Sequence, residues 1–273
     1  MKSDRPPFDR RPLLIGVVHL DPLPGAPRFQ PGRAGRRART SWRDRAVRSA
    51  RVLAEAGFDG VLVENFGDAP FFAKRVPPET TASVAVAAQA VRDAVEPRVL
   101  VGANVLRNDG RAALAVAPAA GLDFVRVNVL TGAVVTDQGL VEGDAATLLR
   151  ARAALAPTVR ILADVQVKHA APLAPRPLEE EATDLVERGG ADAVILTGPR
   201  SGLPVDPGAL RNLRRALPDA VILVGSGVTR ATVGRTLTEA DGVIVGTALE
   251  RGGRTGAPLD ARRANAFVEA ARG

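Results

Sequence analysis

Several residue types are missing or scarce in this chain of 273 residues, and each absence excludes a kind of chemistry. Without cysteine there is no disulfide, no thiolate nucleophile and no cysteine-ligated zinc. Without tyrosine there is no phenolic acid, and aromatic residues make up only 3% of the chain. The core must therefore be built from Val, Leu, Ile and Ala, which suits parallel strands buried on both faces.

Long apolar runs are also missing. No stretch approaches the roughly 18 uninterrupted apolar residues that cross a membrane, and the polar, proline-rich first residues lack the apolar segment of a secretory signal. We therefore expect a cytoplasmic protein. Residues 1–12 are predicted to be a flexible tail and residues 13–273 a single domain.

The formal net charge is +7, and almost all of the positive charge comes from arginine. A basic balance can indicate nucleic acid or an anionic membrane. Here the arginines are interleaved with Asp and Glu and lack aromatic stacking partners, so we expect a solvated surface and no nucleic-acid partner. The exception is the stretch 28–51, which holds nine arginines. It could be an anion site, part of a lid over 21–40, or only surface.

Eight apolar, β-rich runs each precede a helical pattern, which predicts an α/β fold: a single (β/α)8 barrel. The alternative is an open doubly wound sheet, but no Gly-x-Gly-x-x-Gly follows an early strand. The predicted strands span Leu13–His19, Gly60–Glu64, Val99–Asn104, Phe124–Asn128, Val159–Val167, Ala193–Thr197, Val221–Gly225 and Gly242–Gly246.

The helices are predicted from apolar residues at a spacing of 3.6, with stops at Gly57, Gly121 and Gly189. They span Trp42–Ala56, Glu79–Val95, Asp109–Ala120, Asp144–Leu155, Leu178–Arg188, Pro207–Ala216, Thr229–Leu237 and Asp260–Ala270.

The fifth predicted strand carries the clearest chemical signal. Alternation along a strand would put Asp164, Gln166 and Lys168 on one face. Lysine is rare here, with only three against 34 arginines, so Lys168 is a candidate for a titratable amine. The alternative is that it only anchors a neighbouring carboxylate. The two histidines, His19 and His169, each end a predicted strand.

Polar residues gather where the first five predicted strands end, which is the face that carries the active site in a barrel. Some of them could instead be caps, and Asp109 is typical of a helix N-terminus. The predicted catalytic residues are Lys168, Asp164, His19, Glu64 and His169. The predicted substrate-binding residues are Asn65, Asp68, Asn104, Arg107, Arg126, Asn128 and Asp137.

Glycine-rich turns follow the last two predicted strands, where a barrel usually binds phosphate. Backbone N–H groups in such turns approach an anion closely, and we expect Thr229 to open a helix beside them. The alternative is that the glycines only make tight turns. On the phosphate hypothesis, Gly227→Asp should fold but lose anion binding. The predicted phosphate-binding residues are Gly225, Ser226, Gly227, Gly246 and Thr247.

A divalent metal is a further hypothesis. Glu64, Asp68, Asp137 and Asp164, with the two histidines, offer mainly oxygen ligands, which suit Mg²⁺. No His-Glu-x-x-His spacing supports zinc. The sequence identifies no other cofactor.

At these residues the chain resembles the BtpA/SgcQ family. The matching segments lie in the same order along nearly the whole chain. The resemblance implies a TIM barrel of the ribulose-phosphate-binding kind. One family member is associated with photosystem I biogenesis, and others with sugar utilisation. The segments are Ile15–Pro27, Val63–Phe71, Gly102–Asp109, Phe124–Ala133, Thr136–Gly139 and Ile161–Ala170.

Two hypotheses about function follow. The first is an enzyme of the lyase or isomerase type that acts on a small phosphorylated metabolite, such as a sugar phosphate. Aldol cleavage, isomerisation and hydrolysis stay open. The second, from the family resemblance, is a non-catalytic assembly or stability factor of the photosystem I biogenesis type. The sequence also leaves a homo-oligomer open.

Overall fold

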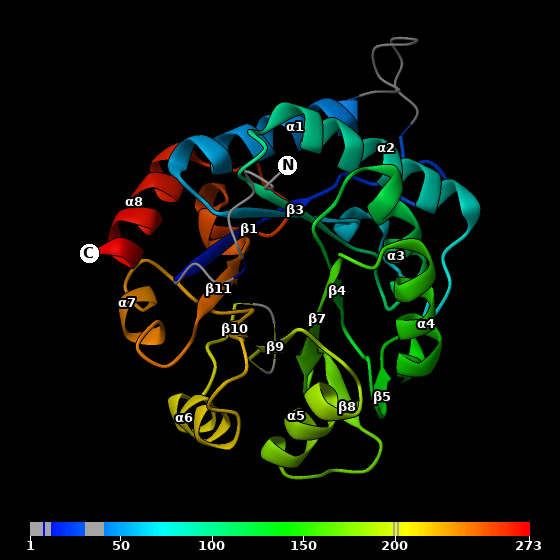
Figure 1. Ribbon diagram of the computed structural model, residues 1–273. Helices are drawn as coiled ribbons and strands as arrows, with labels where there is room; N and C mark the ends of the chain where they lie inside the picture. The colour runs from blue at the N-terminus through cyan, green and yellow to red at the C-terminus, as the bar shows by residue number, and fades with distance from the viewer. Residues whose placement is uncertain (1–7, 9–11, 31–40, 199, 201) are drawn as a thin grey trace.

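The computed structural model describes residues 8, 12–30, 41–198, 200 and 202–273. Within them, eight parallel strands close into a barrel with helices around its outside (Figure 1). The predicted (β/α)8 fold is confirmed, and the open sheet is wrong. In order around the barrel, the strands are β1 Leu13–His19, β11 Gly242–Val245, β10 Ile222–Val224, β9 Ala193–Leu196, β7 Arg160–Val165, β4 Phe124–Val127, β3 Leu100–Asn104 and β2 Gly60–Glu64.

The helices follow the predicted ranges closely, with one exception. Helix α7 covers only Val233–Thr236, and Thr229 does not begin it, which corrects the prediction. Thr229 N–H donates to Thr232 Oγ1 at 3.0 Å, so a local turn replaces the expected first helical turn. The other helices are α1 Ser41–Ala56, α2 Pro78–Ala94, α3 Gly110–Ala119, α4 Ala145–Leu155, α5 Leu178–Glu187, α6 Pro207–Ala216 and α8 Ala261–Arg272.

Tight turns with positive φ follow three of these helices. Gly57 has a φ of 94° and Gly121 a φ of 60°, as expected of glycines that end helices. After α5 the left-handed residue is Gly190, at 70°, one residue beyond the predicted Gly189. These short connections set the start of the next strand.

The barrel interior is filled by alternate residues of the strands. Leu13, Ile15 and Val17 point inward along β1 and pack with inward side chains of the other strands. Phe124 fits at the centre because Gly102 faces it: a Cβ on Gly102 would lie 2.3 Å from the ring. Continuing the same alternation brings polar side chains to the carboxyl end of the barrel.

The other end of the barrel is covered by Phe8. Its ring meets the Phe124 ring edge-on, with centroids 5.7 Å apart. Phe8 belongs to the predicted tail; the rest of that tail, residues 1–7 and 9–11, lies outside the described residues, as does the part of the predicted lid in 31–40.

A second, three-stranded antiparallel sheet was not predicted. Its strands are β6 Gly139–Glu142, β5 Ala133–Thr136 and β8 Ala170–Pro172, in that order. Its Val141 packs with Val129 and Val167 beside the barrel. The segment Thr136–Gly139 matched the family resemblance but was assigned to no predicted strand or helix. It is a hairpin turn, with Thr136 paired to Gly139.

None of the helices described is both long and apolar enough to cross a membrane.

Candidate functional site

A cavity of about 800 Å³ opens at the carboxyl end of the barrel strands. It collects side chains and turns from six strands that are far apart in the sequence. The structure therefore brings most of the predicted catalytic groups and all of the predicted phosphate-binding residues to one place. The predicted residues that line it are His19, Glu64, Arg126, Lys168, Gly225, Ser226, Gly227, Gly246 and Thr247.

The backbone around Lys168 is held in an unusual conformation. Strand β7 ends at Val165, and both Gln166 (φ 48°) and His169 (φ 57°) are left-handed. Such residues persist only where the surroundings hold them. Here Lys168 N–H donates to Thr197 Oγ1 at 3.1 Å, and Lys168 O accepts from Arg107 Nη2 at 2.7 Å. The segment is anchored from both sides.

The early end of β7 corrects the predicted face. Because the strand ends at Val165, the alternation does not continue to Gln166, whose exposed side chain forms a hydrogen bond with Glu181. His169 is also exposed and is not among the residues that line the cavity.

The Lys168 side chain reaches into the cavity, and among the described residues its Nζ has no hydrogen-bond or ion-pair partner. Burial lowers the pKa of Lys168, and the charges of Arg126 and Arg107 lower it further. Glu64 and Asp164 act in the opposite direction without restoring the ordinary value. A lysine in this setting has a larger neutral fraction and can act as a nucleophile.

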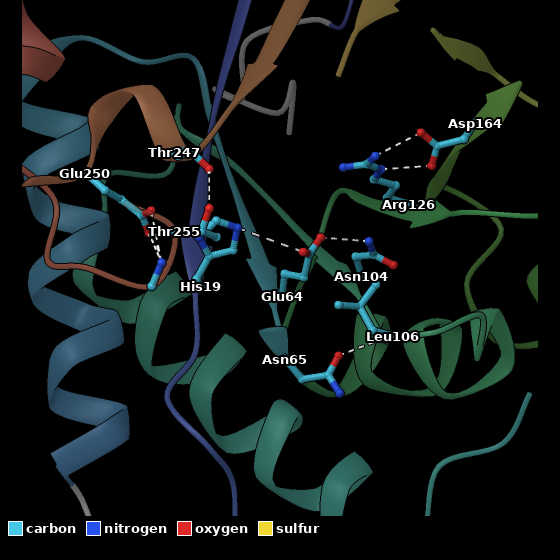
Figure 2. Close-up of polar contacts among 11 residues, drawn as sticks. His19, Glu64, Asn65, Asn104, Leu106, Arg126, Asp164, Thr247, Glu250 and Thr255 are labelled. Carbon is cyan, nitrogen blue, oxygen red and sulfur yellow. Dashed lines mark hydrogen bonds and ion pairs between the residues drawn. The ribbon is translucent and has the colours of Figure 1, made fainter. Parts of the chain in front are cut away.

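Asp164 has a different environment from the one predicted. Its carboxylate is buried and accepts from Arg126 Nη2 at 2.8 Å and Nε at 3.0 Å (Figure 2). Asn128 Nδ2 donates to it at 2.7 Å. Burial lowers the pKa of Arg126, but the Asp164 charge and hydrogen bond outweigh it, so the pKa is raised. Asp164 is thus held by Arg126 and Asn128, and it is not among the residues that line the cavity containing Lys168.

His19 lies between two carboxylates (Figure 2). Its Nδ1 is 2.8 Å from Glu250 Oε1, and its Nε2 is 4.0 Å from Glu64 Oε1. Glu250 is buried and also accepts from Gly256 N–H. Glu250 was not predicted from the sequence, because it lies in no motif and reaches His19 only where β1 and β11 are neighbours in the barrel.

Glu64 combines burial with a lowered pKa. Burial alone would raise the pKa, but the positive charges of His19, Arg126 and Lys168 together lower it. Asn104 Nδ2 also donates to Glu64 Oε2 at 2.8 Å. Glu64 is therefore a carboxylate, placed to accept a proton from a group in the cavity.

The side chains of Asn65 and Asp68 form hydrogen bonds with other residues of the protein. Asn65 Oδ1 accepts from Leu106 N–H at 2.7 Å, and Asn65 Nδ2 donates to Asp68 Oδ2 at 3.0 Å. Asp68 Oδ1 accepts from Leu23 N–H at 2.8 Å. Burial raises the pKa of Asp68, although these hydrogen bonds oppose the change. Both residues hold the loops around the cavity.

Asp109 caps α3, as predicted, through the N–H of Ala112 at 2.9 Å. Asp137 is exposed at the tip of the β5–β6 hairpin. The acidic residues proposed as metal ligands are therefore dispersed, and no three possible ligands come together in the part of the chain that the structure describes. The Mg²⁺ hypothesis has no preformed site there.

The turns after β10 and β11 line the cavity with residues whose backbone N–H groups have no protein acceptor in the described chain. Among the described residues, none of these N–H groups donates a hydrogen bond to the protein. Because all of them border one cavity, they form a cradle suited to an anion. The N–H groups belong to Ser226, Gly227, Val228, Thr247 and Ala248.

The two hydroxyl groups expected to assist an anion already have protein partners. Ser226 Oγ accepts from Gly198 N–H at 2.7 Å, and Thr247 Oγ1 lies 2.9 Å from Thr255 Oγ1. The prediction that Gly227→Asp would fold also needs correction. Gly227 has a φ of 68°, and a Cβ there would lie 2.2 Å from Leu203 O.

The arginine-rich stretch 28–51 lies partly outside the described residues, at 31–40. In the described part, Arg45 donates to Asp21 Oδ1 at 2.6 Å and to Gly256 O. Arg45 thus supports the loop whose Gly256 N–H contacts Glu250.

A family model for the BtpA family matches residues 10–273. The chain belongs to the BtpA family. The photosystem I biogenesis protein BtpA of Synechocystis sp. is 43% identical over 96% of this chain and 89% of its own. An uncharacterized protein of Thermococcus kodakarensis is 44% identical over 97% of both chains.

Solved structures share the TIM-barrel fold of this BtpA-family chain. KGPDC from Streptococcus mutans matches with a TM-score of 0.60 at 12% identity, over 96% of this chain and 98% of that one. Phosphoribosyl anthranilate isomerase from Thermus thermophilus matches with a TM-score of 0.55 at 13% identity, over 94% of this chain and 97% of that one. At these identities the likeness concerns the fold.

Proposed function

We propose that the protein is an enzyme that acts on a small phosphorylated metabolite, of the sugar-phosphate kind, by lyase or isomerase chemistry. The observation that carries the proposal is the cradle of unbonded N–H groups in the same cavity as the Lys168 amine. A phosphate in the cradle would fix one end of the substrate and leave the other beside Lys168 and Glu64.

The groups near Lys168 fit chemistry at a carbonyl carbon. A neutral Lys168 amine could attack the carbonyl and form a Schiff base, with loss of water. In its protonated form the same group could instead stabilise an enolate. Glu64, as a carboxylate, would take a proton from the substrate, and His19 would exchange protons with it.

Anion binding is the first test, with inorganic phosphate as the probe. We expect phosphate to raise the melting temperature of the wild type, because it binds the folded state. Ala248→Asp would add a negative charge to a residue of the cradle, although its side chain packs partly against the core, and should abolish the rise. Ala115→Asp, an exposed change of equal charge on α3, should retain it. A wild-type melt unmoved by millimolar phosphate would contradict the proposal.

The role of Lys168 is tested by borohydride trapping with candidate sugar phosphates, followed by peptide mass spectrometry. Because the chain has three lysines, an adduct is easily assigned. We expect the adduct on Lys168 in the Lys74→Arg control and none in Lys168→Arg. Lys74 is a suitable control because it is exposed and pairs with Glu142 at 2.5 Å. Anion binding without any adduct would leave the enolate role and exclude the Schiff base for the substrates tested.

The name of the Synechocystis relative supports a second candidate, a non-catalytic assembly factor. Such a role does not require an amine with a lowered pKa beside an anion cradle. A chain that bound neither phosphate nor sugar phosphates, but whose deletion lowered photosystem I in a photosynthetic host, would favour this candidate.

A further inference from the structure

The cavity extends beyond the anion cradle to three arginines. Arg230 follows the turn after β10, and Arg262 and Arg263 lie in the first turn of α8. All three line the same cavity as Lys168 and Glu64. The shortness of α7 contributes to this extension, because the residues from Thr229 onward form an open turn where a helix was expected.

Arg230, Arg262 and Arg263 form the outer end of the cavity, and carboxylates of the described residues do not neutralise their positive charges. At the inner end, Arg126 pairs with Asp164, and Lys168 lies near Glu64. At the outer end, no carboxylate of the described chain lies within ion-pair distance of the three guanidinium groups. Asp260, the acidic residue beside them in sequence, is engaged in capping α8 through the N–H groups of Arg262 and Arg263.

One contact fixes the outer end relative to the cradle. Arg263 Nη1 donates to Ala248 O at 3.0 Å, and Ala248 is one of the residues whose N–H is unbonded. The guanidinium of Arg263 therefore lies next to the cradle. Arg230 and Arg262 are exposed, and their side chains have no hydrogen-bond partner among the described residues.

We infer that the cavity takes a substrate with two phosphoryl groups, one in the N–H cradle and the second on Arg230, Arg262 and Arg263. Guanidinium groups bind phosphate oxygens through paired, charge-assisted hydrogen bonds. A single phosphoryl group in the cradle would leave Arg230 and Arg262 without a counter-charge. The volume of about 800 Å³ also accommodates more than a sugar monophosphate. This inference rests on the proposed phosphate-binding role of the cradle.

The test compares probes with one and two phosphoryl groups by calorimetry at constant ionic strength. One pair is inorganic phosphate and pyrophosphate, and the other is fructose 6-phosphate and fructose 1,6-bisphosphate. We expect the doubly phosphorylated member of at least one pair to bind the wild type about tenfold more tightly than its partner. The pair that shows this preference distinguishes contiguous from separated phosphoryl groups.

The Arg230→Gln/Arg262→Gln variant should lose that preference and keep its affinity for the singly phosphorylated probe within about twofold. Because both side chains are exposed and unbonded, we expect the variant to fold, and each single change provides a check. Arg211→Gln, which removes the same charge from an exposed site on α6, should behave like the wild type.

Phosphate binding without a preference in the wild type, or a preference unchanged in the double variant, overturns this inference and leaves the proposed function standing. Failure of the wild type to bind any of the four probes overturns both.

Discussion

His19 Nδ1 and Glu250 Oε1 lie 2.8 Å apart, with both side chains nearly excluded from solvent. A carboxylate can only accept a hydrogen bond, so His19 must be the donor and its Nδ1 must carry a proton. In the neutral imidazole, His19 Nε2 then presents its lone pair toward Glu64 and the cavity. Glu250 is in this sense a positioning residue: it fixes which His19 nitrogen can take a proton.

The first prediction concerns this tautomer. In the wild type, at a pH where the imidazole is neutral, nitrogen-15 NMR should show the His19 proton on Nδ1. Glu250→Gln replaces an obligate acceptor with an amide and should weaken the preference. The chain has two histidines, so His169→Asn assigns the signals. A wild-type His19 protonated on Nε2, or a tautomer unmoved in the variant, would refute the role of Glu250.

The second prediction concerns the buried pair Arg126–Asp164. Asp164→Ala would leave the Arg126 guanidinium buried without its counter-charge and should lower the free energy of unfolding by about 3–5 kcal/mol. The control is Asp184→Ala, which breaks a more exposed ion pair with Arg176 and should lower the free energy of unfolding far less.

Urea denaturation measures both changes. A second substitution, Arg126→Met in the Asp164→Ala background, should recover part of the loss because it removes the unpaired charge. Equal effects of Asp164→Ala and Asp184→Ala would show that the buried pair is not the stabilising feature proposed.

The third prediction concerns the pKa of Lys168. In the Lys2→Arg/Lys74→Arg variant Lys168 is the only lysine, and its side-chain carbon-13 shift can be titrated directly. We expect a midpoint below the ordinary value of 10.5, because burial and then Arg126 disfavour the charged amine. A midpoint at or above 10.5 would show that burial and the neighbouring arginines do not lower the pKa of Lys168.

The same shift has a consequence for stability. Between the lowered pKa of the folded state and 10.5, the unfolded chain binds the Lys168 proton and the folded chain does not. The free energy of unfolding should therefore rise with pH through this window. In Lys168→Met the free energy of unfolding should rise less with pH. A rise of the same size in that variant would show that other groups cause it.

The fourth prediction concerns Gly227. Gly227→Ala should destabilise the fold because the new Cβ would meet Leu203 O, in addition to the cost of a positive φ. Gly132 is a matched control, since its φ of 71° is similar but nothing lies within 4 Å of a Cβ there. We expect a loss of about 1–2 kcal/mol for Gly132→Ala and a further loss of about 1–3 kcal/mol for Gly227→Ala.

Both losses are measured by thermal or chemical denaturation. If the two variants lose equal stability, the turn at Gly227 tolerates a side chain, and the close approach of Leu203 does not constrain it.

The repeating pattern of the sequence determined the barrel. Apolar runs of strand length alternate with segments of helical spacing, and such units close on one another because each strand must be buried on both faces. For the same reason the residues that end the strands had to meet at one rim. His19, Glu64, Arg126 and Lys168 were predictable as neighbours from their positions alone.

Three features depended on local competition that a pattern does not reveal. Alternation predicted Gln166 beside Lys168, but the strand ends at Val165 and the chain turns left-handed. Helical spacing predicted a helix from Thr229, but the hydroxyl of Thr232 captures the Thr229 N–H. The polar segment Thr136–Gly139 is a hairpin turn, in which Thr136 Oγ1 accepts from Gln138 N–H and donates to Gly139 O.

Only the tertiary structure decided what each polar group does. The carboxylates of Asp164 and Glu64 are chemically alike, yet Asp164 is held in an ion pair and Glu64 faces the cavity. Glu250 became a partner of His19 because closure of the barrel places β11 beside β1. Such roles depend on distances of a few ångströms between residues far apart in the chain, and burial then sets the strength of each interaction.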